Sequence, residues 1–421
     1  MSTLFYQIVK FLKLIKPIEK PIESGEISLN FSLLNLKIPK FRYNKNVLIM
    51  KKILAICTLL ILSCNVEKNK NSNLPGRLGN AELELKDDPR VDLRIIEAMK
   101  PYGLHVNAPM PPVSIEASDE DKLNYFKETE PGYQMIFSEW FSGLKGPENI
   151  ETSYQNILGS DGNEIKLTIT KPLNNNSEMP AVLHLHGGGM TILTVSDPNY
   201  VLWRESLASK GLIVIGVEFR NVGGQLGNHP FPAGLNDCVS ALKWVHEKRK
   251  DLGISKIIIS GESGGGNLSI ATALKTKDLG NLDYFDGVYA QCPYISNMYG
   301  NEKDKLPSLI ENNAYFLNVE DMNVMASMYD GPESRDPFAW PLHATGEMLE
   351  GLPPHVITVN ELDPLRDEGL EYYRMLLKSK VNARSKTLNG TVHAAEVIFV
   401  KYIPELFEAT INDIKEFAYS L

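Results

Sequence analysis

Short apolar runs alternate with segments of helical periodicity through most of this chain. Runs of strand length cover residues 181–185, 212–217, 256–259, 287–290, 356–359 and 385–388, and helical periodicity lies between them at residues 200–209, 235–250, 268–275 and 370–378. Such alternation predicts an α/β fold with a mostly parallel sheet and helices on both faces. Runs at 154–157 and 165–170, joined by the turn Ser160-Asp161-Gly162, predict a hairpin that opens the sheet.

Two segments depart from this alternation. Residues 92–100 and 119–141 have helical periodicity before the first strand, and residues 295–354 contain Gly, Pro and Asn clusters around a helix-like stretch at 319–329. Long interruptions inside a compact domain are often functional lids. We therefore expect one domain over residues 74–421, with a cap built from about 84–145 and 295–354.

The first 73 residues have a different character. In residues 50–64, a Met-Lys-Lys start, an apolar run at 53–62 and Ser63-Cys64 resemble a bacterial lipoprotein signal, although Leu62 is unusual at its place. Cleavage before Cys64 would leave that cysteine lipidated, with the Lys/Asn-rich residues 65–73 as a flexible tether. This predicts a lipid-anchored protein on the periplasmic or surface side of a bacterial cell envelope. The alternative is a buried helix or strand at 53–62.

Residues 1–49 are basic and lie before this signal-like segment. We interpret them as a non-native extension upstream of the true start at Met50. A basic amphipathic helix at a membrane surface is the alternative.

Charge and cysteine content exclude several classes of partner. The formal net charge of the whole chain is −9. Residues 1–49 are basic, so the negative charge comes from the residues after 49. An acidic body argues against binding nucleic acid or phosphate groups. The chain has four cysteines, none in a CxxC pair or near paired histidines, so we expect no metal site and no disulfide framework.

The pentapeptide Gly261-Glu262-Ser263-Gly264-Gly265 follows a strand-like run and precedes a helix that we expect to begin near Asn267. A nucleophile elbow needs this context, because its tight turn requires tiny residues two before and two after the serine. Ser263 is therefore the candidate nucleophile. A plain glycine-rich structural turn is the alternative.

A second glycine-rich segment, His186-Gly187-Gly188-Gly189, follows the run at 181–185. Backbone N–H groups of Gly188 and Gly189, with that of Gly264, are the predicted oxyanion hole. The alternatives are a flexible turn or a phosphate cradle. No Gly-Lys-Ser/Thr sequence follows to support the phosphate cradle.

Asp363 follows the strand-like run at 356–359, and His393 follows the run at 385–388. Ser263, Asp363 and His393 thus occur in the order that α/β-hydrolases use for a catalytic triad. Pro364 ends the strand, so we expect Asp363 to project from its carboxyl end. We expect Asp367 and Glu368 to stabilise the first turn of the next helix as capping and dipole residues. The other seven histidines we assign to structural roles.

The motifs together resemble the hormone-sensitive-lipase family of esterases over residues 74–421. They are residues 74–79 (LPGRLG), 186–194 (HGGGMTILT), 229–232 (HPFP), 261–268 (GESGGGNL), 360–369 (NELDPLRDEG) and Val392-His393. The resemblance implies an eight-stranded α/β-hydrolase core, a helical cap, and hydrolysis of carboxylic esters or lactones without a cofactor. Glu262 replaces the family's commoner Asp, and Ala394 stands where a glycine often follows the histidine, which we expect to shift that loop slightly.

The sequence therefore predicts a serine carboxylesterase that acts on a small-molecule ester. Peptidase or acyltransferase chemistry on the same triad is one alternative, and a non-catalytic ligand-binding protein is another. The only membrane contact expected is through a lipid on Cys64.

Overall fold

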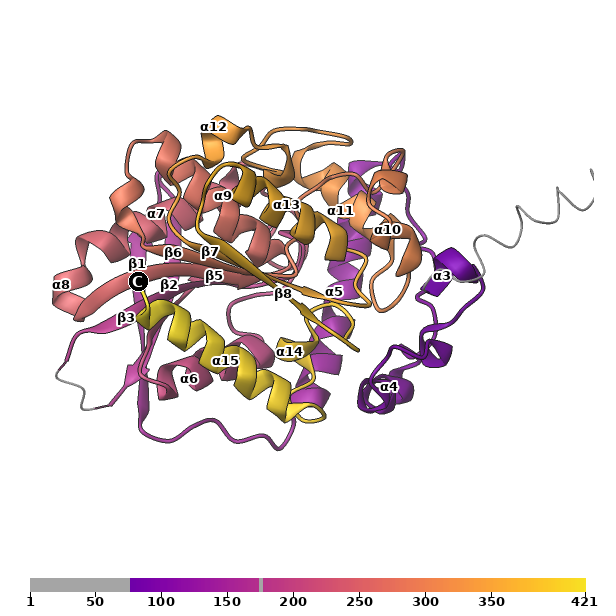
Figure 1. Ribbon diagram of the computed structural model, residues 1–421, viewed down its shortest axis with the longest axis horizontal. Coiled ribbons are helices and arrows are strands. Elements are labelled where there is room, and N and C mark those ends of the chain that lie inside the picture. The colour runs from indigo at the N-terminus through magenta and orange to yellow at the C-terminus, as the bar shows by residue number, and fades with distance from the viewer. Residues whose placement is uncertain (1–75, 174–176) are drawn as a thin grey trace, which may run out of the picture. The chain divides into compact units, whose positions relative to one another are not determined.

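The computed structural model describes residues 76–173 and 177–421 (Figure 1). The predicted upstream extension at 1–49, the lipoprotein signal at 50–64, the tether at 65–73 and the two residues Leu74 and Pro75 lie outside the described residues. Among the helices of the described residues, none combines the length and apolar character needed to cross a membrane.

An eight-stranded sheet, in the order β1-β2-β4-β3-β5-β6-β7-β8, forms the centre of the described part of the chain. The β1–β2 and β2–β4 pairs are antiparallel, and all other neighbours are parallel. This confirms the predicted opening hairpin and the mostly parallel sheet. The strands are β1 (Ile150–Leu158), β2 (Glu164–Pro172), β3 (Met179–Leu185), β4 (Ile213–Glu218), β5 (Ile254–Glu262), β6 (Gly287–Gln291), β7 (His355–Asn360) and β8 (Ala383–Leu388).

Helices cover both faces of the sheet, as the alternating pattern predicted (Figure 1). On one face lie α7 (Ala233–Glu247), α9 (Gly264–Asp278) and α13 (Arg366–Lys378), and on the other lie α6 (Pro198–Ser209) and α15 (Pro404–Tyr419). Successive side chains of a strand point to opposite faces. Accordingly, Leu183 packs into the core under α7 and α9, whereas Val182 packs into the core under α6 and α15.

The remaining helices are short or lie in the two segments that were predicted to form a cap. They are α3 (Gly76–Gly79), α4 (Leu93–Met99), α5 (Asp119–Phe141), α8 (Arg249–Leu252), α10 (Ser308–Glu311), α11 (Val319–Asp330), α12 (Gly346–Leu349) and α14 (Ala395–Ile398). Single 3₁₀ turns occur at Leu85–Asp87, Lys100–Tyr102, Leu282–Tyr284, Lys303–Lys305 and Pro341–His343.

Helix α5 begins at a well-defined cap. The Ser118 hydroxyl accepts a hydrogen bond from the Asp121 N–H at 3.1 Å, and acidic residues fill the first turn, where they favour the helix dipole. At its other end, buried Trp140 packs against Phe316 and Phe399. Helix α5 is thereby joined to both the 295–354 segment and the C-terminal part of the core.

The 295–354 segment has two parts that pack differently. Residues in its middle, including Phe316 and Met325, face a cavity beside the carboxyl ends of the strands. Residues near both of its ends belong to the core instead: Ile295 and Trp340 are fully buried, and the Asn267 amide of α9 donates to the Ala339 carbonyl at 2.8 Å. Only the middle part, residues 316–325, is therefore placed to control access to the site.

Candidate active site

Ser263 occupies a turn of a single residue between a strand and a helix. Strand β5 ends at Glu262 and α9 begins at Gly264, which is earlier than the start near Asn267 that apolar periodicity predicted. Glycines at the start of α9 carry no periodic signal, so the sequence could not locate this boundary. Ser263 has φ 56° and ψ −120°, which is unfavourable for a residue with a side chain.

Close backbone packing requires the two flanking glycines. A Cβ atom at Gly261 would lie 2.2 Å from the Leu185 carbonyl oxygen, and one at Gly265 would lie 1.9 Å from the same oxygen. Both distances are far below van der Waals contact. The structure therefore supports the sequence argument that positions two before and two after the serine have no room for a side chain.

The structure brings Asp363 and His393 together. Nδ1 of His393 donates to Oδ2 of Asp363 at 2.7 Å, and the Leu365 N–H donates to the other oxygen, Oδ1, at 2.9 Å. Asp363 is fully buried and His393 is 5% exposed. Both carboxylate oxygens are thus satisfied, and the hydrogen bond at Nδ1 fixes the tautomer that leaves Nε2 unprotonated in the neutral ring.

Asn360, at the end of β7, holds the loop that carries His393. Its Oδ1 accepts from the Ala394 N–H at 3.2 Å, and its Nδ2 donates at 2.9 Å both to Thr391 and to the buried Glu396. Ala394 has φ 53°, a left-handed conformation. Glycine adopts this conformation without strain, which explains why a glycine often follows the histidine in the family, where this chain has an alanine.

The glycine segment after β3 presents free donors to the cavity. Gly188 and Gly189 have φ 101° and 62°, and within the described residues their N–H groups donate no hydrogen bond. Gly264 is the first residue of α9, where N–H groups have no partner inside the helix. A Cβ at Gly264 would lie 2.8 Å from the Gly189 nitrogen, so these backbone segments are in close contact.

Glu262 holds this loop from the strand beneath it, a contact that sequence reasoning missed. Its Oε1 accepts from the Gly187 N–H at 2.7 Å, and its Oε2 lies 3.4 Å from Nε2 of His184. Burial raises the pKa of Glu262 to about 8, so most of this group is uncharged at neutral pH. The Glu-for-Asp difference was visible in the sequence, but the reach of its side chain was not.

Glu130 of α5 supports the same loop from the opposite side. Its two carboxylate oxygens accept from the Leu193 N–H at 2.7 Å and the Gln225 N–H at 2.6 Å. Glu130 is only 2% exposed. A helix of the N-terminal segment is thus tied directly to the residues that follow the three glycines.

Ser263 and His393 line one cavity of about 290 Å³. Gly188 and Gly189 also line it, and its remaining walls are mostly apolar. The apolar walls come largely from α5 and from the middle of the 295–354 segment, with Phe137, Phe316 and Met325 among them. The predicted nucleophile, the base and two of the three predicted oxyanion donors therefore line one cavity, and Gly264 directly follows the nucleophile.

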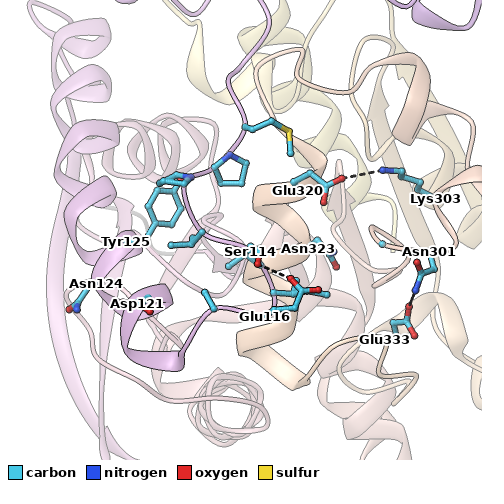
Figure 2. Close-up of a pocket in the computed structure, with 18 of the residues that line it drawn as sticks. Ser114, Glu116, Asp121, Asn124, Tyr125, Asn301, Lys303, Glu320, Asn323 and Glu333 are labelled. Atoms are coloured by element: carbon cyan, nitrogen blue, oxygen red, sulfur yellow. Dashed lines mark hydrogen bonds and ion pairs between the residues drawn. The ribbon is translucent and has the colours of Figure 1, made fainter.

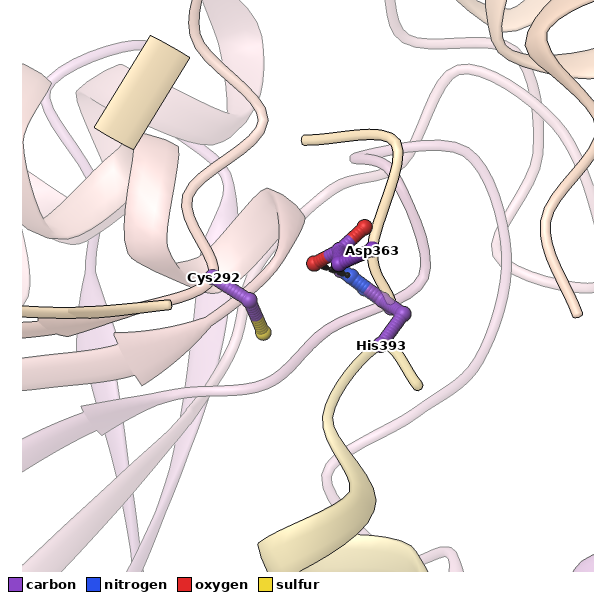
Figure 3. A group of neighbouring side chains, drawn as sticks. All are labelled: Cys292, Asp363 and His393. Atoms are coloured by element: carbon purple, nitrogen blue, oxygen red, sulfur yellow. Dashed lines mark hydrogen bonds and ion pairs between the residues drawn. The ribbon is translucent and has the colours of Figure 1, made fainter. Parts of the chain in front are cut away.

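Cys292 is the third member of a small group with Asp363 and His393 (Figure 3). One potential ligand atom from each lies within 4.8 Å of the others. Burial raises the pKa of the Cys292 thiol well above its usual range, and a protonated thiol is a poor metal ligand. Since Asp363 and His393 already bond each other, this chemistry fits an Asp–His pair beside a packed thiol better than a metal site.

Asp367 and Glu368 lie in the first turn of α13, as predicted, but the prediction that they cap this helix is wrong. No side chain caps this helix, which begins at Arg366, four residues before the predicted start. Asp367 accepts instead from the Ser308 N–H at 2.8 Å, and buried Glu368 accepts from the Ile295 N–H at 3.1 Å. Both acids bind the 295–354 segment, a long-range contact that local spacing cannot reveal.

Most of the remaining histidines have structural surroundings. His186 lies under the glycine loop, where its Nδ1 donates to the Gly187 carbonyl at 2.8 Å and its ring stacks on Phe219. Burial lowers the pKa of His186 to about 3 and that of His355 to about 4, so both rings are neutral.

Comparison with known proteins identifies this arrangement. A family model described as the alpha/beta hydrolase fold matches residues 182–397. The chain belongs to the α/β-hydrolase fold family. The solved structure of brefeldin A esterase, described as a bacterial homologue of human hormone-sensitive lipase, is 42% identical to this hydrolase, with a TM-score of 0.79 over 82% of this chain and 97% of that one. The resemblance to the hormone-sensitive-lipase family is thus confirmed.

Two further relatives are named as esterases. The structure of esterase Est22 is 36% identical, with a TM-score of 0.72 over 80% of this hydrolase and 99% of that chain. Carboxylesterase NlhH of Mycobacterium tuberculosis is 31% identical over 265 residues, which is 61% of this chain and 79% of the relative.

The contact between Glu262 and Gly187 gives a test of loop positioning in this hydrolase. Glu262→Ala removes the acceptor and should lower kcat by about tenfold or more, a smaller loss than removal of an oxyanion donor itself. Glu262→Gln keeps an acceptor and should retain most of the wild-type rate. Above a pH of about 8 the wild-type Glu262 gains a negative charge near the oxyanion donors, so its rate should fall while that of Glu262→Gln holds. Equal rates for the Ala and Gln variants would contradict this role.

Proposed function

We propose that this hydrolase cleaves carboxylic esters through an acyl-enzyme formed on Ser263. The observation that carries the proposal is the cavity that Ser263 and His393 share, with His393 hydrogen-bonded to the buried Asp363 at 2.7 Å. Ser263 stands on a strained one-residue turn, a conformation that persists where the surrounding structure fixes it.

In the first half of the reaction, Nε2 of His393 accepts the Ser263 hydroxyl proton as Oγ bonds to the ester carbonyl carbon. The carbonyl oxygen becomes negative, and its charge is stabilised by N–H groups of Gly188, Gly189 and Gly264. His393 then donates the proton to the leaving alkoxide, which departs as an alcohol. Asp363 holds the ring orientation and stabilises the imidazolium.

In the second half, water replaces the alcohol. His393 accepts a proton from this water as the water oxygen attacks the acyl carbon. The proton passes to Ser263 Oγ when the acyl–oxygen bond breaks, so the carboxylic acid leaves and the serine is restored. The chain's own residues carry out every step.

The cavity supports esters rather than peptides as substrates. Its apolar walls and volume of about 290 Å³ suit a small acyl or alkyl group, and they offer few partners for the many N–H and C=O groups of a peptide chain. The relatives NlhH and Est22 are named as carboxylesterase and esterase. A purely ligand-binding role is disfavoured, because the base His393 and the carboxylate that orients it, Asp363, are both present.

Residues 84–145 and the middle part of 295–354 (residues 316–325) serve as the cap in this proposal. Their support is the direct contact between α5 and α11, in which the Tyr125 hydroxyl donates to Asp321 at 2.8 Å. Both segments line the cavity, so they control which esters reach Ser263.

Ser263→Ala should abolish turnover of a short p-nitrophenyl ester while leaving the thermal unfolding midpoint within a few degrees of wild type. Loss of a triad member typically costs several orders of magnitude in rate. Nitrophenolate release and calorimetry measure the two effects. Retention of more than about a tenth of wild-type kcat would rule out Ser263 as the nucleophile.

Asp363 and Asp367 form a matched pair for testing the orienting carboxylate. Asp363→Asn should lower kcat by roughly 10⁴, because asparagine favours the wrong histidine tautomer. Asp367→Asn should keep near-normal kcat and lose at most about 1 kcal/mol of stability. The Asp367 side chain is partly exposed, and its hydrogen bonds go to Ser308 and Arg366, which lie outside the triad. Measurements of kcat and of the urea unfolding midpoint for both variants show which carboxylate orients His393. An inactive Asp367 variant would refute the assignment of Asp363 to that role.

For location, the proposal is a lipid-anchored protein of a bacterial cell envelope, supported by the signal-like residues 50–64. Translation from Met50 followed by cleavage should leave Cys64 at the mature N-terminus with several acyl chains, since one chain binds membranes only weakly. Mass spectrometry of protein from its native host gives the mass of that terminus. An intact Met1 or an unmodified Cys64 would exclude the anchor.

A further inference from the structure

The wall of the catalytic cavity that α5 and α11 contribute contains one carboxylate, Asp321. Its neighbours in the cavity lining include the apolar Leu317, Met322 and Met325. The Tyr125 hydroxyl of α5 donates to Oδ1 of Asp321 at 2.8 Å, and the polar Tyr133 and Asn318 also line the cavity. None of these groups takes part in the reaction proposed above.

Half of the Asp321 carboxylate is left without a partner. Within the described residues, Oδ2 accepts no hydrogen bond, and no Lys or Arg forms an ion pair with Asp321. Burial raises the pKa of Asp321, and desolvation together with the Asp321 charge raises the pKa of Tyr133 to about 12. Asp321 is partly exposed, so its open oxygen is accessible to a donor group on a ligand in the cavity.

We infer that Asp321 is a specificity-determining residue that accepts a hydrogen bond from a hydroxyl group of the substrate, so that the preferred substrates are hydroxylated esters. The inference rests on the proposed ester hydrolysis, since it concerns the same cavity. Asp321 and Ser263 lie on different walls, one on α11 and the other between β5 and α9. The hydroxyl therefore belongs on a part of the substrate away from the reacting carbonyl.

The chemistry of this wall favours a hydroxyl over an ammonium group. An ammonium ion would lose its hydration on entering a mostly apolar cavity, with half a carboxylate as its main compensation. A hydroxyl has less hydration to lose, and it donates one bond, which matches the one open oxygen. Sites built to bond a hydroxyl discriminate against analogues that lack it, because the acceptor then gains no bond from the substrate.

A second cavity outside this wall supplies a matched control residue (Figure 2). It measures about 1130 Å³ and shares Tyr125 with the catalytic cavity, but Asp321 does not line it. Glu320, the residue before Asp321 on α11, lines this outer cavity and bonds Lys303 at 3.1 Å. Glu320→Gln therefore removes a neighbouring negative charge without altering the catalytic cavity.

The experiment measures kcat/KM for pairs of butyrate esters by titrating released acid. Each ω-hydroxyalkyl butyrate is compared with the n-alkyl and ω-ammonioalkyl butyrates of equal chain length, and ω-hydroxyalkanoate and alkanoate methyl esters test the acyl side. For wild type and Glu320→Gln, at least one hydroxy ester should exceed its alkyl partner by about tenfold or more, the usual value of a hydrogen bond to a charged group. In Asp321→Ala, which removes the acceptor, that ratio should fall to about twofold or less.

Three outcomes would overturn the inference while leaving ester hydrolysis intact. The first is turnover of alkyl butyrates by wild type with no preference for any hydroxy ester. The second is a hydroxyl preference that survives Asp321→Ala, and the third is a preference for the ammonium esters alone. Failure to hydrolyse any of the esters would instead count against the proposed function itself.

Discussion

The close approach of three backbone segments around Ser263 is the constraint on which the rest of the site depends. The end of β3, the turn after β5 and the start of α9 meet where Gly261 and Gly265 pack against the Leu185 carbonyl. Parallel pairing of β3 with β5 extends to Leu185 and Gly261, so sheet register itself brings the two glycine-rich segments together. The unfavourable backbone angles of Ser263 are maintained because strand and helix fix the chain on both sides.

Much of this arrangement could be predicted from the sequence because its signals are local. Short strand-like runs, most of them apolar, located all eight strands, and glycines at Gly188, Gly261 and Gly265 marked positions where a side chain has no room. The order of Ser263, Asp363 and His393 followed the order of the strands that carry them. Each of these inferences needed only neighbouring residues and the rule that parallel strands end at one edge of a sheet.

What the sequence could not reveal depends on contacts between distant segments. Glu368 has the spacing of a residue in a first helical turn, yet its carboxylate bonds the Ile295 N–H, and burial raises its pKa to about 8. Glu262 was noticed only as a departure from a motif, although it holds the Gly187 N–H. In both cases a long acidic side chain satisfies a backbone donor far away in the chain, and no periodicity records such a bond.

The two hydrogen bonds of Glu130 have a mechanical consequence. Because this buried carboxyl group accepts from both Leu193 and Gln225, α5 cannot move away from the core at that point without breaking both hydrogen bonds. Loss of both bonds costs about 2 kcal/mol or more, which is a substantial part of a domain's stability. Helix α5 is therefore fixed in position beside the glycine loop. Any movement of the cap that admits an ester must take place away from this contact, so the loop that stabilises the oxyanion can keep its position while the cavity entrance opens.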